Sequence, residues 1–495
     1  MTRTAFSRTL LVLVASFAII GAVLLVDGSI PRGGAPGDLG RGGPHVTDVN
    51  PEAAEQAEEV AERQEAYEAA LEAGTFGQQV PITGTPAAGW AGEQIVDQTV
   101  DDWEPAIAAD PHSGYVYALV TRYGVPKPCK GNCPSPVIEM IISADNGATW
   151  SAATPLCACK GGGQFDPIIE VVPDTGDVYA LFMIGFNVVF TKSTDHGQHW
   201  SEPVATWGNV SWNDKPVLAM SDDGDDVYVS FNGPTGGDPW AVQSHDGGET
   251  WSQVKLVDSK RYYFAFDADV APDGTVYFSE GGLVYTNAGN SSDVVDTIDQ
   301  VVFISRDDGA TWETHTVATV RPGVDCDAAG CSPDFYIGHS AVTVDAAGGV
   351  SLLIDGAQDL GGLQTIRAYR SANAGQTWSG PVTLSVPTEN ATAPAAEAGA
   401  AGDIRAWYYQ TSGGGNDDAW NVWYRRSTDG GTTWSAPLRI SDAISGAPYK
   451  TAAGFAEVYG DYGEIAITST GKTIGIWGEG ISWTGPGGCW FNREL

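Results

Sequence analysis

Basic side chains are scarce in this sequence. Its 495 residues include 25 lysines and arginines against 62 aspartates and glutamates, which gives a formal net charge of −37. Such a surface repels phosphate backbones, so we expect no binding to nucleic acid. The charge does not imply disorder, because 42% of the residues are hydrophobic and can form a core. The 63 glycines and 17 tryptophans predict many tight turns and large packing anchors, and they exclude helix bundles and coiled coils.

Long apolar runs are equally scarce. A single uncharged run of 17 residues, 10–26, follows the basic Arg3 and Arg8. This length suits either a signal-peptide core or a short transmembrane helix. No A-x-A arrangement follows the run, which favours an uncleaved anchor over a cleaved signal peptide within residues 1–30. In either case the sequence predicts an extracytoplasmic protein, membrane-anchored or secreted.

Two segments separate this run from the rest of the chain. Residues 31–44 are rich in glycine and proline and predict a linker, and residues 51–74 predict a helix. Asn50 can cap that helix, Pro51 suits its first turn, and Gly74 suits its end. Its faces carry mostly Ala and Glu, so it buries little and is expected to be a spacer, or else a partner-binding helix. Residues 31–92 are therefore assigned to a linker and an acidic helix.

One octet recurs six times beyond residue 100. Its pattern is Ser-x-Asp/Asn-x-Gly-x-x-Trp, and its copies begin at Ser143, Ser193, Ser244, Ser305, Ser371 and Ser427. They are spaced by 50 to 66 residues, about 57 on average, a period typical of propellers and solenoids. The Asp or Asn can accept backbone N–H bonds, the glycine can take a positive φ, and the tryptophan can anchor the turn. The octet therefore predicts a structural turn rather than a catalytic motif.

A second pattern lies upstream of the octets and recurs seven times. Each copy reads as two short alternating strands joined by a turn, as in residues 104–117 and 166–179. With the hairpin that carries an octet, each unit has four strands, which is one propeller blade. We therefore expect an all-β, seven-bladed β-propeller over residues 93–495, with six blades as the alternative. The last blade needs a fourth strand from the N-terminal side, for which residues 93–100 are the candidate.

The six octets resemble the Asp boxes of BNR-repeat proteins, and over about 400 residues the chain is similar to sialidase-like β-propellers. The closing segments Tyr459-Gly-Asp461-Tyr462-Gly and Ile476-Trp477-Gly look like the last blade of such proteins. The resemblance implies that the boxes lie between the third and fourth strands, on the side away from the functional funnel. It therefore specifies the fold more strongly than the function.

The family's sialidases hold the substrate carboxylate with three arginines, and they use a Tyr–Glu pair as nucleophile and an Asp as acid/base. Their first arginine lies in a Phe/Tyr-Arg-Ile-Pro motif, which this sequence lacks. Arg122, Arg261 and Arg321 are the arginines whose positions can reach the funnel, and none has a motif around it. The departure argues against sialidase chemistry.

Blade topology predicts which side chains surround the funnel, because they come from the start of each first strand and the end of each second strand. The first set is Glu104, Asp166, Asp214, Lys215, Asp267, His339, Asp461 and Tyr462, and the second is Arg122, Asn232, Glu280, Asp355, Gln410 and Glu479. Paired carboxylates of this kind can run glycoside hydrolysis as acid and base or nucleophile, and crowded carboxylates suit Ca²⁺. Equally, they can cap strands and bind neighbouring blades.

From these sets we select candidates for each role. The candidate catalytic residues are Asp166, Asp267, Glu280 and Tyr462. The candidate ligand-binding residues are Glu104, Arg122, Asp214, Lys215, Arg261, Arg321, His339 and Asp461. No cofactor is expected to be required, although Ca²⁺ fits the carboxylates. The seven histidines lack the spacing of a zinc site.

Seven cysteines lie in loops that this topology places on the funnel side: Cys129, Cys133, Cys157, Cys159, Cys326, Cys331 and Cys489. Export permits disulfides, and Cys326 and Cys331 suit a local bridge. The first four cysteines belong to the first blade and Cys489 to the last, so they can pair among themselves across the ring closure. The alternatives are a metal site made by four of them, or free thiols. An odd count leaves one thiol unpaired.

Two functions remain open at this point. The first is a sialidase-like propeller directed at glycans, acting as a glycoside hydrolase through funnel carboxylates. The second is a non-catalytic platform at the cell surface that binds a protein, a polysaccharide or a cation. Two funnel carboxylates roughly 5–10 Å apart beside a sugar-sized pocket would favour the first. A funnel filled by side chains would favour the second.

Overall fold

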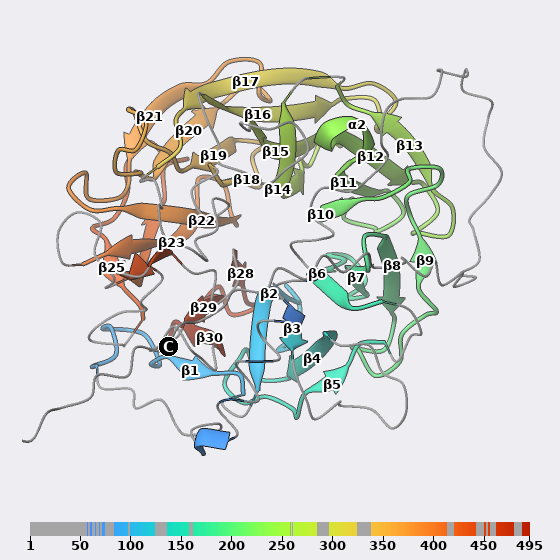
Figure 1. Cartoon of the computed structure of the whole chain (residues 1–495), viewed down its shortest axis with the longest axis horizontal. Helices are drawn as coiled ribbons and strands as arrows, with labels where there is room; N and C mark the ends of the chain where they lie inside the picture. Colours follow the sequence, from blue (N-terminus) through green and yellow to red (C-terminus); the bar gives the residue numbers. More distant parts are fainter. Residues whose placement is uncertain are drawn as a thin grey trace, which may run out of the picture.

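The structure of the chain is a computed structural model. It describes residues 84–97, 100–123, 136–157, 162–257, 259, 261–284, 297–323, 338–412, 420–441, 450–451, 454–455, 462–479 and 488–495, with a few positions between 57 and 74. These residues form seven four-stranded antiparallel sheets arranged in a ring, as Figure 1 shows. The seven-bladed propeller is thereby confirmed, and the six-bladed alternative is excluded.

Each blade runs outward from the axis of the ring. Blade 1 contains β2 (Asp101–Ala109), β3 (Val116–Tyr123), β4 (Val137–Ser143) and β5 (Thr154–Pro155). Blade 2 contains β6 (Gln164–Val171), β7 (Val178–Ile184), β8 (Val188–Ser193) and β9 (Val204–Ala205). Blade 3 contains β10 (Asp214–Met220), β11 (Val227–Gly233), β12 (Asp238–Ser244) and β13 (Ser252–Lys255).

The remaining blades repeat this order. Blade 4 contains β14 (Tyr262–Val270), β15 (Val276–Leu283), β16 (Ile298–Ser305) and β17 (Glu313–Val320). Blade 5 contains β18 (Ser340–Val344), β19 (Val350–Ile354), β20 (Arg367–Ser371) and β21 (Ser379–Thr383). Blade 6 contains β22 (Ala391–Ala398), β23 (Ile404–Thr411), β24 (Trp420–Ser427) and β25 (Leu438–Arg439). A small hairpin, β26 (Lys450–Thr451) and β27 (Gly454–Phe455), precedes the last blade.

Blade 7 joins the two ends of the chain. It contains β28 (Glu464–Ile467), β29 (Thr473–Glu479), β30 (Gly488–Arg493) and, as its outermost strand, β1 (Gln94–Ile95). Gln94 pairs with Phe491, and Trp90 forms a further bridge with Glu494. The closing strand thus lies within the predicted segment 93–100, and it pairs the edge of β30 that would otherwise be open.

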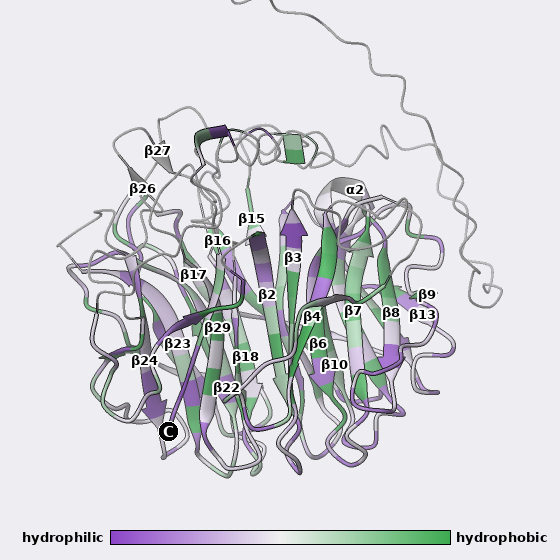
Figure 2. Ribbon diagram, turned by 90° about the horizontal axis from the view of Figure 1, so that it is seen from below, coloured by the Kyte–Doolittle hydropathy of each residue, from purple (hydrophilic) through white to green (hydrophobic). Residues whose placement is uncertain are grey.

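The hydrophobic core lies between neighbouring blades. Strands bury alternate residues on each face, so the side chains of one sheet interlock with those of the next. Between blades 6 and 7, for example, the indole rings of Trp407 and Trp477 are fully buried, with ring centroids 6.0 Å apart. Figure 2 shows the strands as largely hydrophobic, whereas polar residues are frequent in the turns.

The six octets form the predicted turns between the third and fourth strands. In each octet the serine hydroxyl accepts a hydrogen bond from the glycine N–H at 2.9 Å. The Asp or Asn side chain accepts the backbone N–H four residues further on, at 2.8 to 3.0 Å. In the first octet Asn146 and Gly147 have φ of 57° and 77°, a left-handed pair that reverses the chain.

Ser143→Ala is expected to destabilise the protein by about 1–2 kcal/mol. The buried hydroxyl accepts the N–H groups of Gly147 and Asp145 at 2.9 and 3.2 Å, and alanine would leave these donors without their partner. Chemical denaturation would measure the change in the free energy of unfolding. The exposed Ser252, at the start of β13, provides the control, since Ser252→Ala should change it by less than about 0.5 kcal/mol. Equal effects of the two substitutions would contradict a stabilising role for the octet.

Helices are few among the described residues. The short α2 (Pro234–Gly237) lies at the end of the blades opposite the octets, and Figure 2 shows it there. The described positions between 57 and 73 are helical, which agrees with the helix predicted for residues 51–74. Val60 packs against an apolar cluster of blades 1 to 3, whereas the other described positions of this helix are exposed.

The predicted N-terminal anchor falls outside the described part of the chain. Among the described residues, no helix has both the length and the apolar character needed to cross a bilayer. Residues 10–26 are not among them, so the anchor and the signal peptide stay predictions, as do the domain limits 1–30, 31–92 and 93–495.

Candidate functional site

The axis of the ring contains a cavity of about 460 Å³. Its lining comes from the innermost strands of all seven blades: β2, β6, β10, β14, β18, β22 and β28. Because every blade contributes, no local segment of the sequence could form it alone. The end of the cavity near α2, opposite the octets, is called the mouth below.

The innermost strands are distorted at the mouth. In blades 1, 2, 3 and 6 the register with the second strand shifts by a bulge. One residue at each bulge has a φ of 46° to 48° and stands directly before a proline: Glu104, Asp166, Lys215 and Ala393. This conformation is strained for a residue with a side chain, particularly before proline. Strain repeated at one level of the ring indicates a functional position, because packing alone would favour a regular strand.

Three side chains from three blades meet at this level. The Tyr462 hydroxyl donates a hydrogen bond to Asp166 Oδ1 at 3.1 Å. Lys215 Nζ lies 3.4 Å from the same oxygen and 5.6 Å from the centre of the Tyr462 ring. Glu104 holds the backbone of Asp166 in place. Its carboxylate accepts hydrogen bonds from the Asp166 N–H at 3.0 Å and from the Thr121 hydroxyl at 2.6 Å. We call Asp166, Lys215 and Tyr462 the mouth triad.

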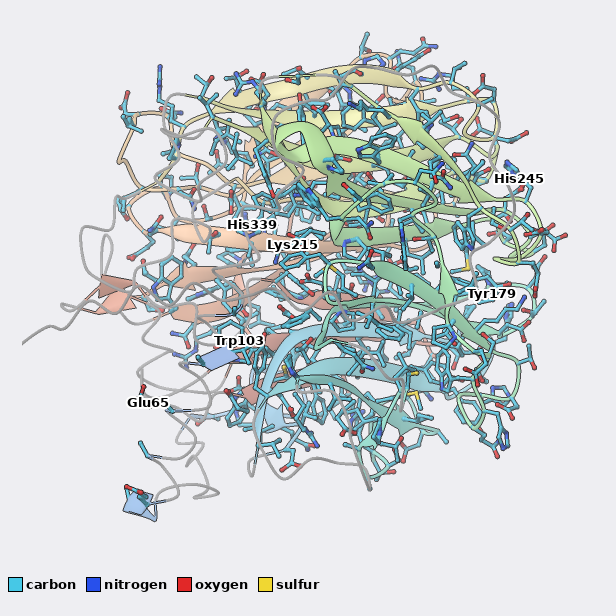
Figure 3. The ribbon with its side chains drawn as sticks, turned by 45° about the vertical axis from the view of Figure 1, so that its right-hand side comes forward. Glu65, Trp103, Tyr179, Lys215, His245 and His339 are labelled. Carbon is cyan, nitrogen blue, oxygen red and sulfur yellow. The ribbon has the colours of Figure 1, made fainter. Side chains whose placement is uncertain are left out.

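A second polar group lines the cavity from blade 5. His339 is 4% exposed, and its Nδ1 lies 3.3 Å from Asp355 Oδ2. The same Asp355 oxygen accepts the Thr392 hydroxyl at 2.7 Å and the Ala393 N–H at 3.0 Å, so the carboxylate is fixed by three contacts. The ring of Phe266 packs against the imidazole, with centroids 4.8 Å apart. Figure 3 shows Lys215 and His339 inside the ring, whereas His245 lies at its outer rim.

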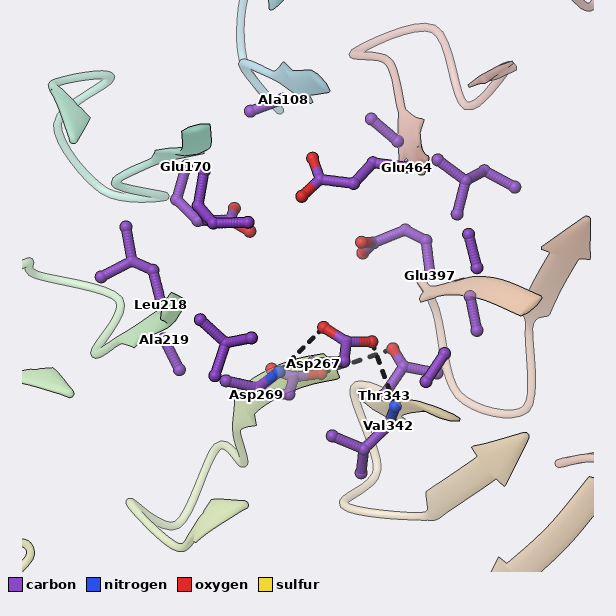
Figure 4. A pocket seen from close by; sticks show the side chains of 18 of the residues that line it. Ala108, Glu170, Leu218, Ala219, Asp267, Asp269, Val342, Thr343, Glu397 and Glu464 are labelled. Carbon is purple, nitrogen blue, oxygen red and sulfur yellow. Dashed lines mark hydrogen bonds between the residues drawn. The ribbon is translucent and has the colours of Figure 1, made fainter. Parts of the chain in front are cut away.

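Just beyond the end of β10, Asp222 lines the cavity. On the innermost strands, five further carboxyl groups line it deeper along the axis: Glu170, Asp267, Asp269, Glu397 and Glu464. Figure 4 shows them pointing into the space between the strands. Burial raises the pKa of Glu170, Asp267, Glu397 and Glu464 well above the usual range, and neighbouring carboxylates add to the effect. Burial also raises the pKa of Asp269, to about 7. Burial therefore favours the protonated form of these groups, and the crowding of carboxyl groups disfavours a further negative charge among them.

Three of these carboxyl groups connect neighbouring blades. Asp267 accepts the Val342 N–H at 3.0 Å and Asp269 accepts the Val344 N–H at 2.7 Å, both across the gap from blade 4 to blade 5. Glu464 of blade 7 accepts the Ile107 N–H of blade 1 at 2.7 Å. Each innermost strand is the edge of its sheet, so these carboxylates satisfy N–H groups that no strand can pair.

The predicted site residues are divided by the structure. Those that line the cavity are Asp166, Lys215, Asp267, His339 and Tyr462. Those placed away from it are Glu104, Arg122, Asp214, Arg261, Glu280 and Arg321. Asp461 lies outside the described residues. Glu170, Asp269, Glu397 and Glu464 were missed by sequence reasoning, although Glu170 and Asp269 follow Asp166 and Asp267 at even spacing along one strand.

The three candidate arginines do not converge. Arg122 binds Asp102 through two hydrogen bonds of 2.7 and 2.9 Å. Arg261 forms an ion pair with Asp299 at 3.0 Å and donates to backbone oxygens of its own blade. Arg321 forms backbone hydrogen bonds with Ala357, and no arginine lines the described cavity. The described residues therefore form no arginine clamp of the sialidase kind.

Glu280 is buried between blades 3 and 4. It is 1% exposed, and one of its oxygens accepts the Ser230 hydroxyl at 2.6 Å. Burial raises the pKa of this carboxyl to about 8. Since the folded state binds the proton more tightly than the unfolded chain, Glu280 lowers the free energy of unfolding as the pH rises from about 4.5 to 8.

Glu280→Gln should remove that dependence. We expect the stability of the variant to rise relative to the unaltered protein by roughly 1 kcal/mol for each pH unit within this window. Denaturation at pH 5, 6.5 and 8 would measure the difference. Glu249→Gln, at an exposed glutamate on the outer face, is the matched control and should show no such trend. A constant difference between Glu280→Gln and the unaltered protein would mean that Glu280 keeps an ordinary pKa.

Two of the seven cysteines are described. Cys157 is disulfide-bonded, and Cys489 is a free, fully buried thiol whose pKa is raised by burial. The idea that Cys489 pairs with the cysteines of blade 1 is therefore wrong, because its side chain is buried in the core between blades 7 and 1. Cys129, Cys133, Cys159, Cys326 and Cys331 lie outside the described residues, so their pairing stays a prediction.

Calcium binding also stays a prediction. Within the part of the chain that the structure describes, no group of three or more His, Cys, Asp or Glu side chains is arranged to hold a metal ion. Of the carboxyl groups in the cavity, Asp267, Asp269 and Glu464 already accept backbone N–H bonds from neighbouring blades.

Comparisons with known proteins give one family match and several structural neighbours. Residues 80–322 match the model of the BNR repeat-like domain. An ulvan lyase described as a polysaccharide lyase is 14% identical, with a TM-score of 0.49 over 81% of this chain and 94% of that chain. A Hadza microbial sialidase is 13% identical, with a TM-score of 0.42 over 76% of each chain.

A further structural neighbour is the NanB sialidase from Streptococcus pneumoniae, which is 11% identical, with a TM-score of 0.41 over 84% of this chain and 70% of that chain. The comparison with curated proteins finds no match.

Proposed function

We propose that the mouth of this propeller binds a glycan and hydrolyses a glycosidic bond there; the match of residues 80–322 to the BNR repeat-like domain and the six Asp-box-like octets support a glycan-directed propeller. The observation that carries this proposal is the contact of 3.1 Å between the Tyr462 hydroxyl and Asp166 at the mouth of a cavity. A tyrosine hydroxyl that donates a hydrogen bond to a carboxylate has a base in place to take its proton, which activates its oxygen as a nucleophile. Tyrosine nucleophiles are known among glycoside hydrolases.

Each member of the mouth triad has a role in this reaction. Asp166 accepts the phenolic proton while Tyr462 Oη attacks the anomeric carbon of the sugar. Lys215 Nζ, 3.4 Å from Asp166, supplies the positive charge that stabilises the phenolate before attack and the phenolate released afterwards. The backbone strain at Asp166 and Lys215 fixes both groups before substrate binds, so little reorganisation is needed.

The charge of the cavity restricts the substrate. Its lining contains no arginine in the described residues, and the single lysine is already paired with Asp166. The five deeper carboxyl groups disfavour a second negative group. We therefore assign the site to a neutral glycan rather than to sialic acid, whose carboxylate needs a cationic clamp.

A panel of fluorogenic glycosides tests the proposal on the full chain. It should include neutral hexosides, hexosaminides and sialosides, at low and high salt, with and without Ca²⁺. We expect turnover of at least one neutral glycoside and none of the sialosides. If an unsaturated sugar is released, the protein cleaves the glycosidic bond by elimination and not by hydrolysis. Folded protein that turns over no member of the panel would favour the alternative function, a non-catalytic platform that binds a polysaccharide, a protein or a cation.

The proposed location is outside the cytoplasm. It rests on the apolar run 10–26 and the acidic, lysine-poor composition. Attachment to the membrane through that run, and the absence of nucleic-acid partners, are part of this proposal.

A further inference from the structure

We propose that His339, oriented by Asp355, is the acid/base residue of this hydrolase, the group that protonates the leaving oxygen and then activates water. The inference rests on the proposed function, which needs such a group beside the nucleophile. It goes beyond the Tyr–carboxylate arrangement, because it assigns proton transfer to an imidazole rather than to a carboxyl group.

The Asp355 contact determines how the imidazole is used. The Asp355 carboxylate accepts Nδ1–H of His339 at 3.3 Å, and it is itself held by Thr392 and Ala393 N–H. Asp355 is fully buried, so this orientation is maintained by groups that solvent does not reach. With Nδ1 bound to Asp355, Nε2 is the nitrogen that remains for proton transfer, and the His339 side chain lines the cavity.

The position of His339 in the ring fits the second catalytic group. Tyr462 and Asp166 belong to blades 7 and 2, which flank blade 1. His339 belongs to blade 5, which is two steps from blade 7 and three steps from blade 2, the largest separation in a ring of seven, so it lies across the cavity from Asp166 and the Tyr462 hydroxyl bound to it. A sugar in the cavity would thus have the nucleophile on one side and the acid/base group on the other, as glycosidic cleavage requires.

The carboxyl groups of the cavity are less suited to this role. Asp267 is bound to the N–H groups of Val342 and Ala268, and Asp269 to those of Val344 and Val270. Glu464 is bound to the N–H group of Ile107. Glu170 and Glu397 lie four residues beyond Asp166 and Ala393, which is roughly 10 Å deeper at 3.3 Å for each residue once the bulge in each strand is allowed for. His339 is the remaining titratable group of the described lining on the blade 5 side of the mouth.

The proposed reaction balances in two steps. In the first, Tyr462 Oη forms a bond with the anomeric carbon, its proton passes to Asp166, and the glycosidic C–O bond breaks as imidazolium Nε2–H protonates the leaving oxygen. In the second, neutral Nε2 takes a proton from water, the hydroxide oxygen bonds to the anomeric carbon, and the phenolate leaves and regains its proton from Asp166. The sum is one water consumed and two hydroxyl groups formed.

The test is the dependence of the rate on the leaving group, which a merely structural role would not change. For His339→Gln we expect kcat/KM to fall by about 10²–10⁴-fold on a glycoside with an alkyl leaving group, which needs protonation. On the matching dinitrophenyl glycoside, whose leaving group needs none, the fall should be less than about 10-fold. Asp355→Asn should show the same pattern with smaller losses. The control is His245→Gln, at a His–Asp pair of 2.7 Å on the outer rim, which should leave both rates unchanged.

The possible outcomes distinguish a failure of the acid/base assignment from a failure of the proposed hydrolase function. Equal losses of His339→Gln on both glycosides would overturn the acid/base assignment while the hydrolase itself stands. If His339→Gln retains the unaltered kcat/KM on both glycosides, the acid/base assignment is overturned as well. If the unaltered protein turns over neither glycoside, the proposed function fails and this inference fails with it. If His339→Gln does not fold, Asp355→Asn decides: a larger loss of kcat/KM on the alkyl glycoside than on the dinitrophenyl glycoside supports the assignment, and equal losses overturn it.

Discussion

Tyr462→Phe is expected to lower kcat on the best neutral glycoside by at least about 10³-fold. The variant keeps the ring but loses the hydroxyl that donates to Asp166 at 3.1 Å, and with it the atom proposed to attack the sugar. Binding should change far less, because the pocket keeps its shape. Steady-state kinetics on the full chain would measure both effects, as a large loss in kcat and a small change in KM.

The control for this substitution is Tyr115→Phe. Tyr115 lies at the octet end of blade 1, where its ring stacks on His196 with centroids 4.2 Å apart, and its loss of a hydroxyl should leave the kinetics unchanged. A fluorinated activated glycoside should also label Tyr462, and peptide mass spectrometry would locate the adduct. Activity of Tyr462→Phe within 10-fold of the unaltered protein, or an adduct on another residue, would rule out Tyr462 as the nucleophile.

Trp90→Ala is expected to reduce the free energy of unfolding by about 3–5 kcal/mol. Trp90 precedes the first strand in the sequence, yet its side chain is 4% exposed within the core between blades 6 and 7. It packs edge-to-face against Tyr424 with ring centroids 5.0 Å apart. Its backbone bridges to Glu494 next to the C-terminus. The substitution thus leaves a large cavity where the ring of blades closes.

Urea denaturation of the two proteins would measure this loss. Leu360→Ala, at a side chain that is 60% exposed, is the control and should change the stability by less than about 0.5 kcal/mol. Amide hydrogen exchange adds a local measurement, in which the amides of β30 should lose more protection than those of β11 in Trp90→Ala. An unchanged stability would mean that the N-terminal segment does not hold the ring closed.

The fold could be predicted from the sequence because its signals are local and repeated. Ser143, Asp145, Gly147 and Trp150 form their turn within eight residues, so the pattern is visible without knowledge of the tertiary structure. Seven copies of the strand pair gave the number of blades. The closing strand followed from the lack of a partner for β30.

The candidate site could be predicted only in part. The start of each first strand does reach the mouth, as Asp166, Lys215, His339 and Tyr462 show. The ends of the second strands do not line the cavity, since Glu280 faces the neighbouring blade instead. The topology gives the level of a residue along the axis, but the pleat and the bulges decide whether its side chain faces the axis or the next blade.

The sequence by itself thus determined a seven-bladed Asp-box propeller closed by its own N-terminal strand, since turn chemistry and alternation act over a few residues. Only the tertiary structure decided that Tyr462 meets Asp166, 296 positions away in sequence, and that Asp355 holds His339. It also decided that Arg122 and Arg261 are engaged by Asp102 and Asp299 rather than directed at a ligand. These pairings depend on the angle between blades and on strained residues at the bulges, which are fixed when the whole ring closes around its axis.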